Sequence, residues 1–131
     1  MKKPPAIGTT KELEFIVEPS QTIDFADGDM PAVLSTPALV GLLERTAREL
    51  LQPLLEPDER TVGTEIELKH LAPTPPGEKI TCLARVIHVD GGATTLHIEA
   101  RDEHELIARG LHTRHVVRVD RFAQRVAKKR R

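Results

Sequence analysis

The segment that most constrains the fold is STPALVGLLERTARELL, residues 35–51, the one long helical pattern in the chain. Ser35 or Thr36 begins it, and Pro37 falls in the first turn, where a missing N–H costs nothing. The pattern ends near Leu51, just before a proline. We therefore predict one helix of about four turns.

This helix is too apolar to lie on the surface of a small sheet. On a helical wheel drawn at about 100° per residue over the helix and the residues just after it, one broad arc is aliphatic. The arc holds Leu39, Val40, Leu42, Leu43, Ala47, Leu50, Leu51 and Leu54, and Arg45, Arg48 and Glu49 lie opposite. The rest of the chain must cover this face.

The rest of the chain carries strand patterns. Alternation of apolar and polar residues predicts strands in 11–19, 61–72, 79–89, 93–102 and 105–119. Asp90-Gly91-Gly92 predicts a hairpin turn. In the second of these strands Val62, Thr64, Ile66, Leu68 and His70 share one parity, which we expect to face the core. Residues 20–32 are expected to form an irregular connection that acts as a lid.

One strand, one apolar helix and at least four further strands predict an α+β protein in which a curved antiparallel sheet wraps around one long central helix, the hot-dog arrangement. We expect a single domain over residues 1–131, with 1–10 and about 122–131 flexible or peripheral. The exposed edge strands of such a sheet favour pairing with a second copy, so we expect a homodimer.

Composition excludes several classes of function. The formal net charge is −1, and three Phe are the only aromatic residues, so a nucleic-acid partner is not expected. A single cysteine, Cys82, and the lack of a long apolar run favour a cytoplasmic protein without membrane contact. His112 and His115 point to opposite faces of a strand, so neither a metal nor another cofactor is expected.

Thr36, Glu44 and His70 supply a hydroxyl, a carboxylate and an imidazole at the border of the buried face. Thr36 and Glu44 lie roughly 80° apart round the helix and about 12 Å apart along it. Such a set can activate a nucleophile or a water molecule. Each residue also has a plain reading: a helix N-cap for Thr36, a border residue that reaches solvent or pairs with Arg48 for Glu44, and a backbone hydrogen bond for His70.

The chain resembles the fluoroacetyl-CoA thioesterase family of hot-dog proteins from about Lys11 to about Arg125. The resemblance is densest in residues 30–47 (MPAVLSTPALVGLLERTA), 54–77 (LLEPDERTVGTEIELKHLAPTPPG) and 110–117 (GLHTRHVV). It implies that Thr36, Glu44 and His70 are the catalytic set. It also implies two substrate-binding residues, Gly63 near the thioester and Arg114 as the family's late-strand arginine. From the residues alone, Gly63 equally suits a bulge or close packing, and Arg114 a structural ion pair.

The resemblance departs from the family in the segment before the helix. The fluoroacetyl-specific enzyme has phenylalanines there, which close over the acyl group, whereas this chain has Asp27 and Met30. We therefore expect hydrolysis of a small acyl-CoA with Met30 near the acyl group, and a different or broader acyl preference. Whether Thr36 attacks the thioester or Glu44 activates a water molecule stays open.

Two other functions fit the same fold. A hot-dog hydratase or dehydratase of acyl thioesters usually has a His/Asp pair, and residues 67–77 lack the neighbouring acid. A non-catalytic domain that binds acyl-CoA would keep the cleft without needing the polar residues. In all three cases the expected partners are an acyl-CoA and a second copy of the chain.

Overall fold

The computed structural model describes residues 1–25 and 27–130 of the chain. Its elements are β1 (Thr10–Ile16), the 3-10 helix η1 (Pro19–Gln21), β2 (Thr22–Ile23), β3 (Val33–Leu34), α1 (Thr36–Leu51), the 3-10 helix η2 (Gln52–Leu54), β4 (Glu59–His70), β5 (Lys79–Asp90), β6 (Ala93–Arg101), β7 (Leu106–Arg118) and α2 (Val119–Lys128). The predicted α+β order of one helix among antiparallel strands is confirmed.

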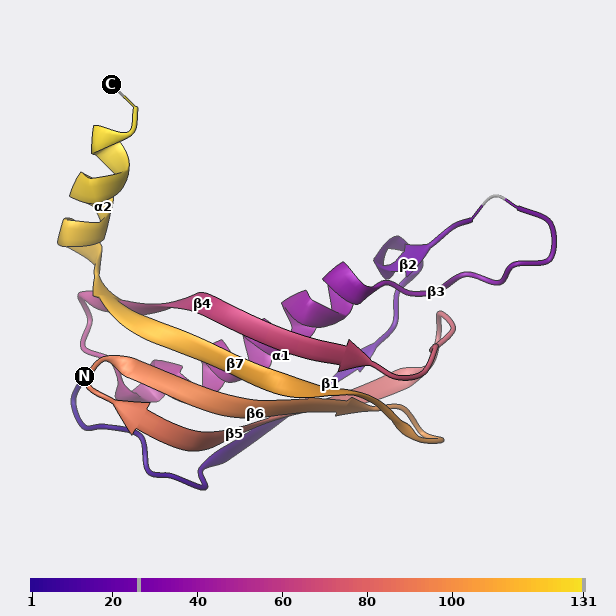
Figure 1. Cartoon of the computed structure of the whole chain (residues 1–131), viewed down its shortest axis with the longest axis horizontal. Coiled ribbons are helices and arrows are strands. Elements are labelled where there is room, and N and C mark those ends of the chain that lie inside the picture. The colour runs from indigo at the N-terminus through magenta and orange to yellow at the C-terminus, as the bar shows by residue number, and fades with distance from the viewer. Residues whose placement is uncertain (26, 131) are drawn as a thin grey trace.

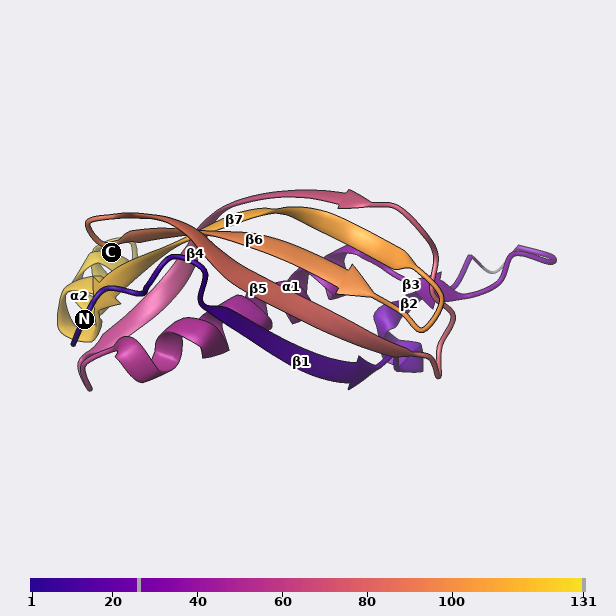
Figure 2. The same cartoon turned by 90° about the horizontal axis from the view of Figure 1, so that it is seen from below.

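Five strands form one antiparallel sheet in the order β1-β5-β6-β7-β4. The sheet is curved, and α1 runs along its concave face (Figures 1 and 2). Gly91 and Gly92 form the predicted turn between β5 and β6, with Gly91 at a positive φ of 59°. The two edges of the sheet are β1 and β4.

The core lies between α1 and the concave face of the sheet, as expected from the breadth of the apolar arc. It combines the buried aliphatic residues of α1 with those of β5, β6 and β7. Its fully buried members include Leu39, Leu43, Leu51, Ile80, Val86, Leu96, Ile98 and Ile107. Thr46 is also buried, and its hydroxyl is satisfied because it donates to the Leu42 carbonyl oxygen at 2.9 Å.

The N-cap of α1 is Ser35, and Thr36 is the first helical residue. The Ser35 hydroxyl accepts a hydrogen bond from the Ala38 N–H at 3.2 Å. The reading of Thr36 as a plain N-cap was therefore wrong, because the neighbouring serine satisfies the free donor. This leaves the Thr36 hydroxyl available for another partner.

A β-bulge in β4 changes the face that part of this strand presents to the core. The pairing with β7 shifts between Gly63 and Glu65, which leaves Thr64 as the extra residue. The expectation that Val62 and Thr64 share a face with Ile66 was wrong. Each extra residue inverts the alternation, so Thr61 and Gly63 face inward before the bulge.

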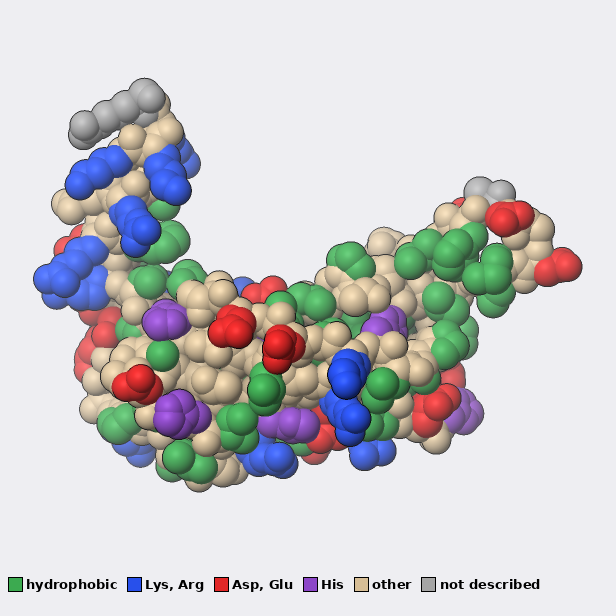
Figure 3. All heavy atoms as spheres, viewed as in Figure 1, with side chains coloured by type: hydrophobic (Ala, Val, Ile, Leu, Met, Phe, Trp, Pro, Cys, Tyr) green, Lys and Arg blue, Asp and Glu red, His purple; other side chains and the backbone are tan. Residues whose placement is uncertain are grey.

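Two segments project beyond the β4 edge of the sheet (Figures 1 and 3). At one end α2 leaves the body, and none of its residues is buried. At the other end lie residues 20–32, expected to be irregular, of which residues 20–25 and 27–32 are described and form an arm whose base is the two-residue ladder of β2 and β3. Residues 1–9 follow the body, where the Lys2 N–H donates to the Leu54 carbonyl oxygen at 2.8 Å.

The assignment of the N-cap leads to a stability prediction. Ser35→Ala should lower the free energy of unfolding by about 1 kcal/mol, because the Ala38 N–H loses its acceptor. Thr36→Ala is the matched control and should cost less. Urea unfolding followed by circular dichroism measures both variants, and a larger loss in Thr36→Ala than in Ser35→Ala would contradict the assignment.

Candidate active site

Thr36 and His70 meet where the first turn of α1 reaches the last residue of β4. The Thr36 Oγ1 and His70 Nδ1 atoms are 2.9 Å apart, within hydrogen-bond distance. This contact joins residues 34 positions apart in the sequence. A hydroxyl in hydrogen bond with an imidazole is the arrangement in which the ring can take the hydroxyl proton.

The imidazole of His70 is suited to act as a base. Burial lowers the pKa of His70, and the Ala72 backbone partly opposes this shift. The ring is therefore neutral at pH 7. Its Nε2 atom is buried and has no hydrogen-bond partner of good geometry among the described residues. One side of the ring thus holds Thr36, and the other is left for a further polar group.

The N-terminus of α1 offers one N–H beside this pair. The Ala38 N–H donates to the Ser35 hydroxyl, the Leu39 N–H donates to the Ser35 carbonyl oxygen, and Pro37 has no N–H. The Thr36 N–H is then the donor of the first turn that no described residue accepts from. A free N–H at the positive end of a helix favours a negatively charged oxygen.

Glu44 belongs to a second polar group, about two turns along α1. Its carboxylate Oε2 lies 3.6 Å from Nη1 of Arg114. The Glu44 side chain is 41% exposed and that of Arg114 only 5%. The ion-pair partner of Glu44 is therefore Arg114 of β7, and not Arg48 of its own helix as the plain reading had it.

Arg114 is held by β4 as well. Its Nε donates to the Thr61 hydroxyl at 3.0 Å and its Nη2 to the Thr61 carbonyl oxygen at 2.8 Å. Burial lowers the pKa of Arg114, and the Glu44 carboxylate opposes this. The fork geometry of the guanidinium lets one side chain make these contacts together.

Gly63 lies directly under this group. A Cβ atom at position 63 would come within 2.6 Å of Glu44 Oε2 and 3.0 Å of His112 Cε1. Such distances exclude a side chain with the neighbours in place. Close packing therefore explains this glycine, and the bulge follows it in the strand.

His112 is a member of this group that the sequence reasoning did not select. It was considered only as a metal ligand, yet its ring is buried and its Nε2 lies 3.2 Å from Nη1 of Arg114. Its neighbour in the pattern, His115, is exposed on the other face as expected. The signal that could have found His112 is its spacing of two from Arg114 on one strand face.

The three expected catalytic residues therefore fall into two groups within one chain. Thr36 and His70 form one group, while Glu44, Gly63 and Arg114 share the other. Among residues 1–25 and 27–130, no hydrogen bond or ion pair joins Glu44 to Thr36 or to His70. A depression of about 260 Å³ borders the second group and is lined by Glu44, Gly63, Thr64, Glu65, Ile66 and His112.

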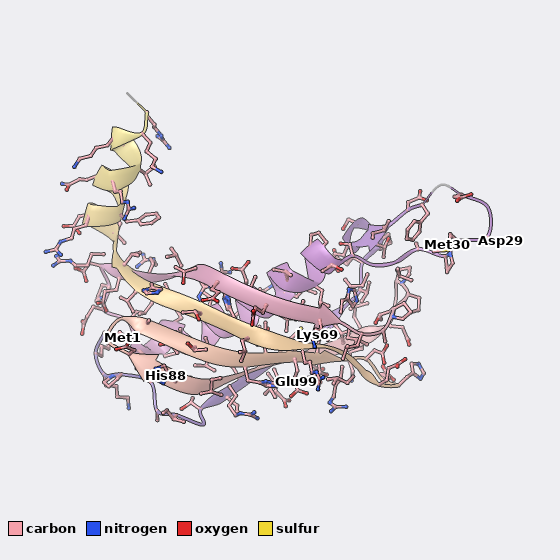
Figure 4. The ribbon with its side chains drawn as sticks, in the orientation of Figure 1. Met1, Asp29, Met30, Lys69, His88 and Glu99 are labelled. Carbon is pink, nitrogen blue, oxygen red and sulfur yellow. The ribbon has the colours of Figure 1, made fainter. Side chains whose placement is uncertain are left out.

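Met30 lies on the arm, away from both groups. Figure 4 shows Met30 and Asp29 on the part of the arm that projects from the body. Met30 is 54% exposed, and Asp27 is also exposed. The nearby Ile23 and Phe25 of the arm are exposed apolar residues too.

Two other histidines have structural partners. His97 pairs with Glu99 at 3.0 Å, and His104 pairs with Glu78 at 2.9 Å. Burial raises the pKa of Cys82 to about 12, so its thiol is unreactive. In the described part of the chain, no three His, Cys, Asp or Glu side chains are grouped to hold a metal ion. None of its helices is long and apolar enough to span a membrane.

Comparison with known proteins gives consistent matches. The family model of the fluoroacetyl-CoA-specific thioesterase matches residues 17–120. The fluoroacetyl-CoA thioesterase of Streptantibioticus cattleyicolor is 32% identical over 137 positions, covering 98% of this chain and 97% of that one.

Solved structures agree with these matches. A crystal structure of a mutant of the fluoroacetyl-CoA-specific thioesterase aligns with a TM-score of 0.89 at 30% identity, covering 98% of this chain and 99% of that one. A structure of the same mutant with fluoroacetate and CoA aligns at 0.84 and 31% identity, over 90% and 99%. A thioesterase superfamily member from Thermus thermophilus aligns at 0.86 and 27% identity, over 99% and 97%. The chain therefore has the hot-dog fold and belongs to the fluoroacetyl-CoA-specific thioesterase family.

Proposed function

We propose that this protein hydrolyses a small acyl-CoA to the free acid and CoA, with Thr36, Glu44 and His70 as its catalytic residues. Family membership supports the reaction class. The observation that carries the assignment is the 2.9 Å contact between the Thr36 hydroxyl and the His70 imidazole, beside the Thr36 N–H, from which none of the described residues accepts a hydrogen bond. Coenzyme A enters as part of the substrate, and the proposal needs no metal or other cofactor.

The first step is attack by the Thr36 hydroxyl oxygen on the thioester carbonyl carbon, while its proton passes to Nδ1 of His70. The Thr36 N–H and the helix dipole favour the negative charge that develops on the carbonyl oxygen. The C–S bond then breaks, and His70 returns the proton to the CoA sulfur. A water molecule then gives a proton to His70 and attacks the acyl-threonine carbonyl carbon, and His70 returns that proton to the departing Thr36 oxygen. The role of the Glu44 carboxylate, supplied by the second copy in the dimer proposed below, is to orient the His70 imidazole and stabilise its protonated form.

Mutation tests this assignment directly. Thr36→Ala and His70→Ala should each lower kcat/KM for acetyl-CoA by about a hundredfold to ten-thousandfold, since each removes the nucleophile or its base. Free-thiol release by purified protein measures the rates. Thr10→Ala and His88→Ala change exposed residues of the same types and serve as matched controls, with rates within about twofold of wild type.

Wild type and Thr36→Ala also distinguish hydrolysis through an acyl-threonine from direct attack of water on the thioester. A covalent route predicts an acyl group on the peptide that contains Thr36 when a slow substrate is quenched and examined by mass spectrometry. Direct attack by water leaves that peptide unmodified and a large residual rate in Thr36→Ala. Binding of acyl-CoA without hydrolysis by wild type would reject the thioesterase and favour a non-catalytic domain.

We further propose that the active form is a homodimer paired along β4. This strand is a sheet edge of 12 residues, and α2 and the arm project near its two ends (Figure 1). Gly63 and His70 lie roughly 20 Å apart at about 3.3 Å per residue. Antiparallel pairing of two β4 strands about Ile66 and Glu67 would bring Glu44 and Gly63 of one copy opposite His70 of the other.

Mixing two inactive variants tests this pairing. Glu44→Gln and His70→Ala should each be inactive alone, but a mixture that exchanges subunits should recover up to about a quarter of wild-type activity, because half the dimers carry one intact site. Refolding the two together permits exchange, and light scattering verifies the dimer. No recovery in exchanged dimers would mean that each site is built within one copy.

The arm leads to a proposal on acyl preference. Met30 and Asp27 occupy the positions at which the fluoroacetyl-specific enzyme carries aromatic side chains. An unbranched thioether adapts to several shapes and selects among them less than a rigid ring. We therefore propose that this protein accepts a broader range of small acyl groups. We also propose a cytoplasmic location, which fits the single free cysteine.

A substrate panel measures this preference. The kcat/KM for fluoroacetyl-CoA should be lower than those for acetyl-, propionyl- and butyryl-CoA. Met30→Phe should shift the ratio toward fluoroacetyl-CoA, whereas Ile7→Phe, at an exposed apolar residue outside the arm, is the control and should leave it unchanged. Equal or better turnover of fluoroacetyl-CoA by wild type would overturn the proposal.

A further inference from the structure

His112 has one defined protonation state in this structure. Its Nδ1 lies 2.8 Å from the Glu65 carbonyl oxygen, which can only accept, so Nδ1 carries the hydrogen. Its Nε2 lies 3.2 Å from Nη1 of Arg114, which can only donate, so Nε2 is the acceptor. The two contacts together require the neutral ring with its hydrogen on Nδ1.

The same contact completes the restraint on Arg114. Thr61 accepts from Nε and Nη2, and His112 accepts from Nη1. The guanidinium is thereby held from both β4 and β7, with Nη1 also facing the Glu44 carboxylate at 3.6 Å. Glu44 has no other ion-pair partner in the described part of the chain, so the position of Arg114 governs where its charge lies.

A second proton on His112 would break this arrangement. It would place an N–H of Nε2 against an N–H of Arg114 and add a positive charge beside a buried guanidinium. Burial is the largest cause of the lowered pKa of His112, and the Arg114 charge acts in the same direction. The Glu65 carbonyl and the Glu44 carboxylate oppose the shift, and Arg48 faces Arg114 from α1.

We propose that His112 is a positioning residue of the thioesterase: its neutral Nε2 fixes Arg114, and through Arg114 it orients the catalytic carboxylate of Glu44. The ring borders the same depression as Glu44 and Gly63. A side chain needed only to fill the core would not require an acceptor at this point, because an aliphatic residue packs without polar groups. The proposal rests on the catalytic role proposed above for Glu44.

Two substitutions separate positioning from packing. His112→Gln retains an amide oxygen near the place of Nε2, and His112→Leu retains bulk without an acceptor. His112→Leu should lower kcat by about tenfold to a hundredfold, as expected for the loss of a hydrogen bond to a charged group, while KM changes less than about threefold. His112→Gln should stay within about threefold of wild type. Equal losses in both variants would overturn the proposal.

The pH profile gives a readout that a packing role would not change. Burial lowers the pKa of both His70 and His112, and each ring must be neutral for its proposed role. Wild-type activity should therefore be present at pH 7 and should be lost as the pH falls through the two lowered pKa values. The plot of log kcat/KM against pH should therefore approach a slope of about two on its acid side, and about one in His112→Gln. An unchanged slope in His112→Gln would contradict the role.

Nitrogen NMR tests the geometry without activity. In ¹⁵N-labelled wild-type protein, His112 should show hydrogen on Nδ1 and none on Nε2 at neutral pH, and His112→Leu should shift the Nε–H resonance of Arg114. The Nε2–H tautomer, or a charged ring at neutral pH, would overturn the proposal even if His112→Leu fails to fold. If wild-type protein hydrolyses no thioester, the proposed function is rejected, while the NMR result still reports on the contact between His112 and Arg114.

Discussion

The packing of α1 against the concave face of the sheet is the contact on which the rest of the structure depends. Burying its aliphatic face fixes both the rotation of the helix and its position along β4. With those two quantities set, Thr36 reaches His70 at one end of the strand, and Glu44 reaches the group around Gly63 two turns later. The polar residues lie at the border of the apolar face, so the force that folds the domain also places its chemistry.

The bulge at Thr64 is the second constraint, and it acts on β4 alone. Without it, strict alternation would turn Thr61 and Gly63 outward whenever Ile66 and Leu68 face the core. The extra residue allows both stretches to face α1. The strand can therefore present the partners of Arg114 before the bulge and the apolar residues and His70 after it.

Much of the fold follows from the sequence, because its periodicities are strong and local. The bounds of α1, the hairpin at Gly91 and the existence of four strands after α1 rest on patterns of a few residues each. The bulge could not be read, since nothing in VGTE marks which residue leaves the ladder. Of the site, the resemblance led to Thr36, Glu44 and His70 as one set, but only the structure shows that Thr36 and His70 are in contact and that Glu44 lies apart from them within the chain. The group around His112 depends on distances between three separate elements. A buried histidine and a surface histidine look alike in a strand pattern, and only packing tells them apart.

The arm is joined to the body by a ladder of two residue pairs, Thr22 with Leu34 and Ile23 with Val33, and by single backbone bonds beside it. Its exposed residues contribute little to the core, so replacing them costs little folding free energy. The residues around Thr36 and Glu44, by contrast, share contacts with the helix and the sheet. In the function proposed above, selection can therefore change the arm that faces the acyl group without changing the elements that hold Thr36 and Glu44, so proteins with the same reaction can differ in substrate through this one short segment.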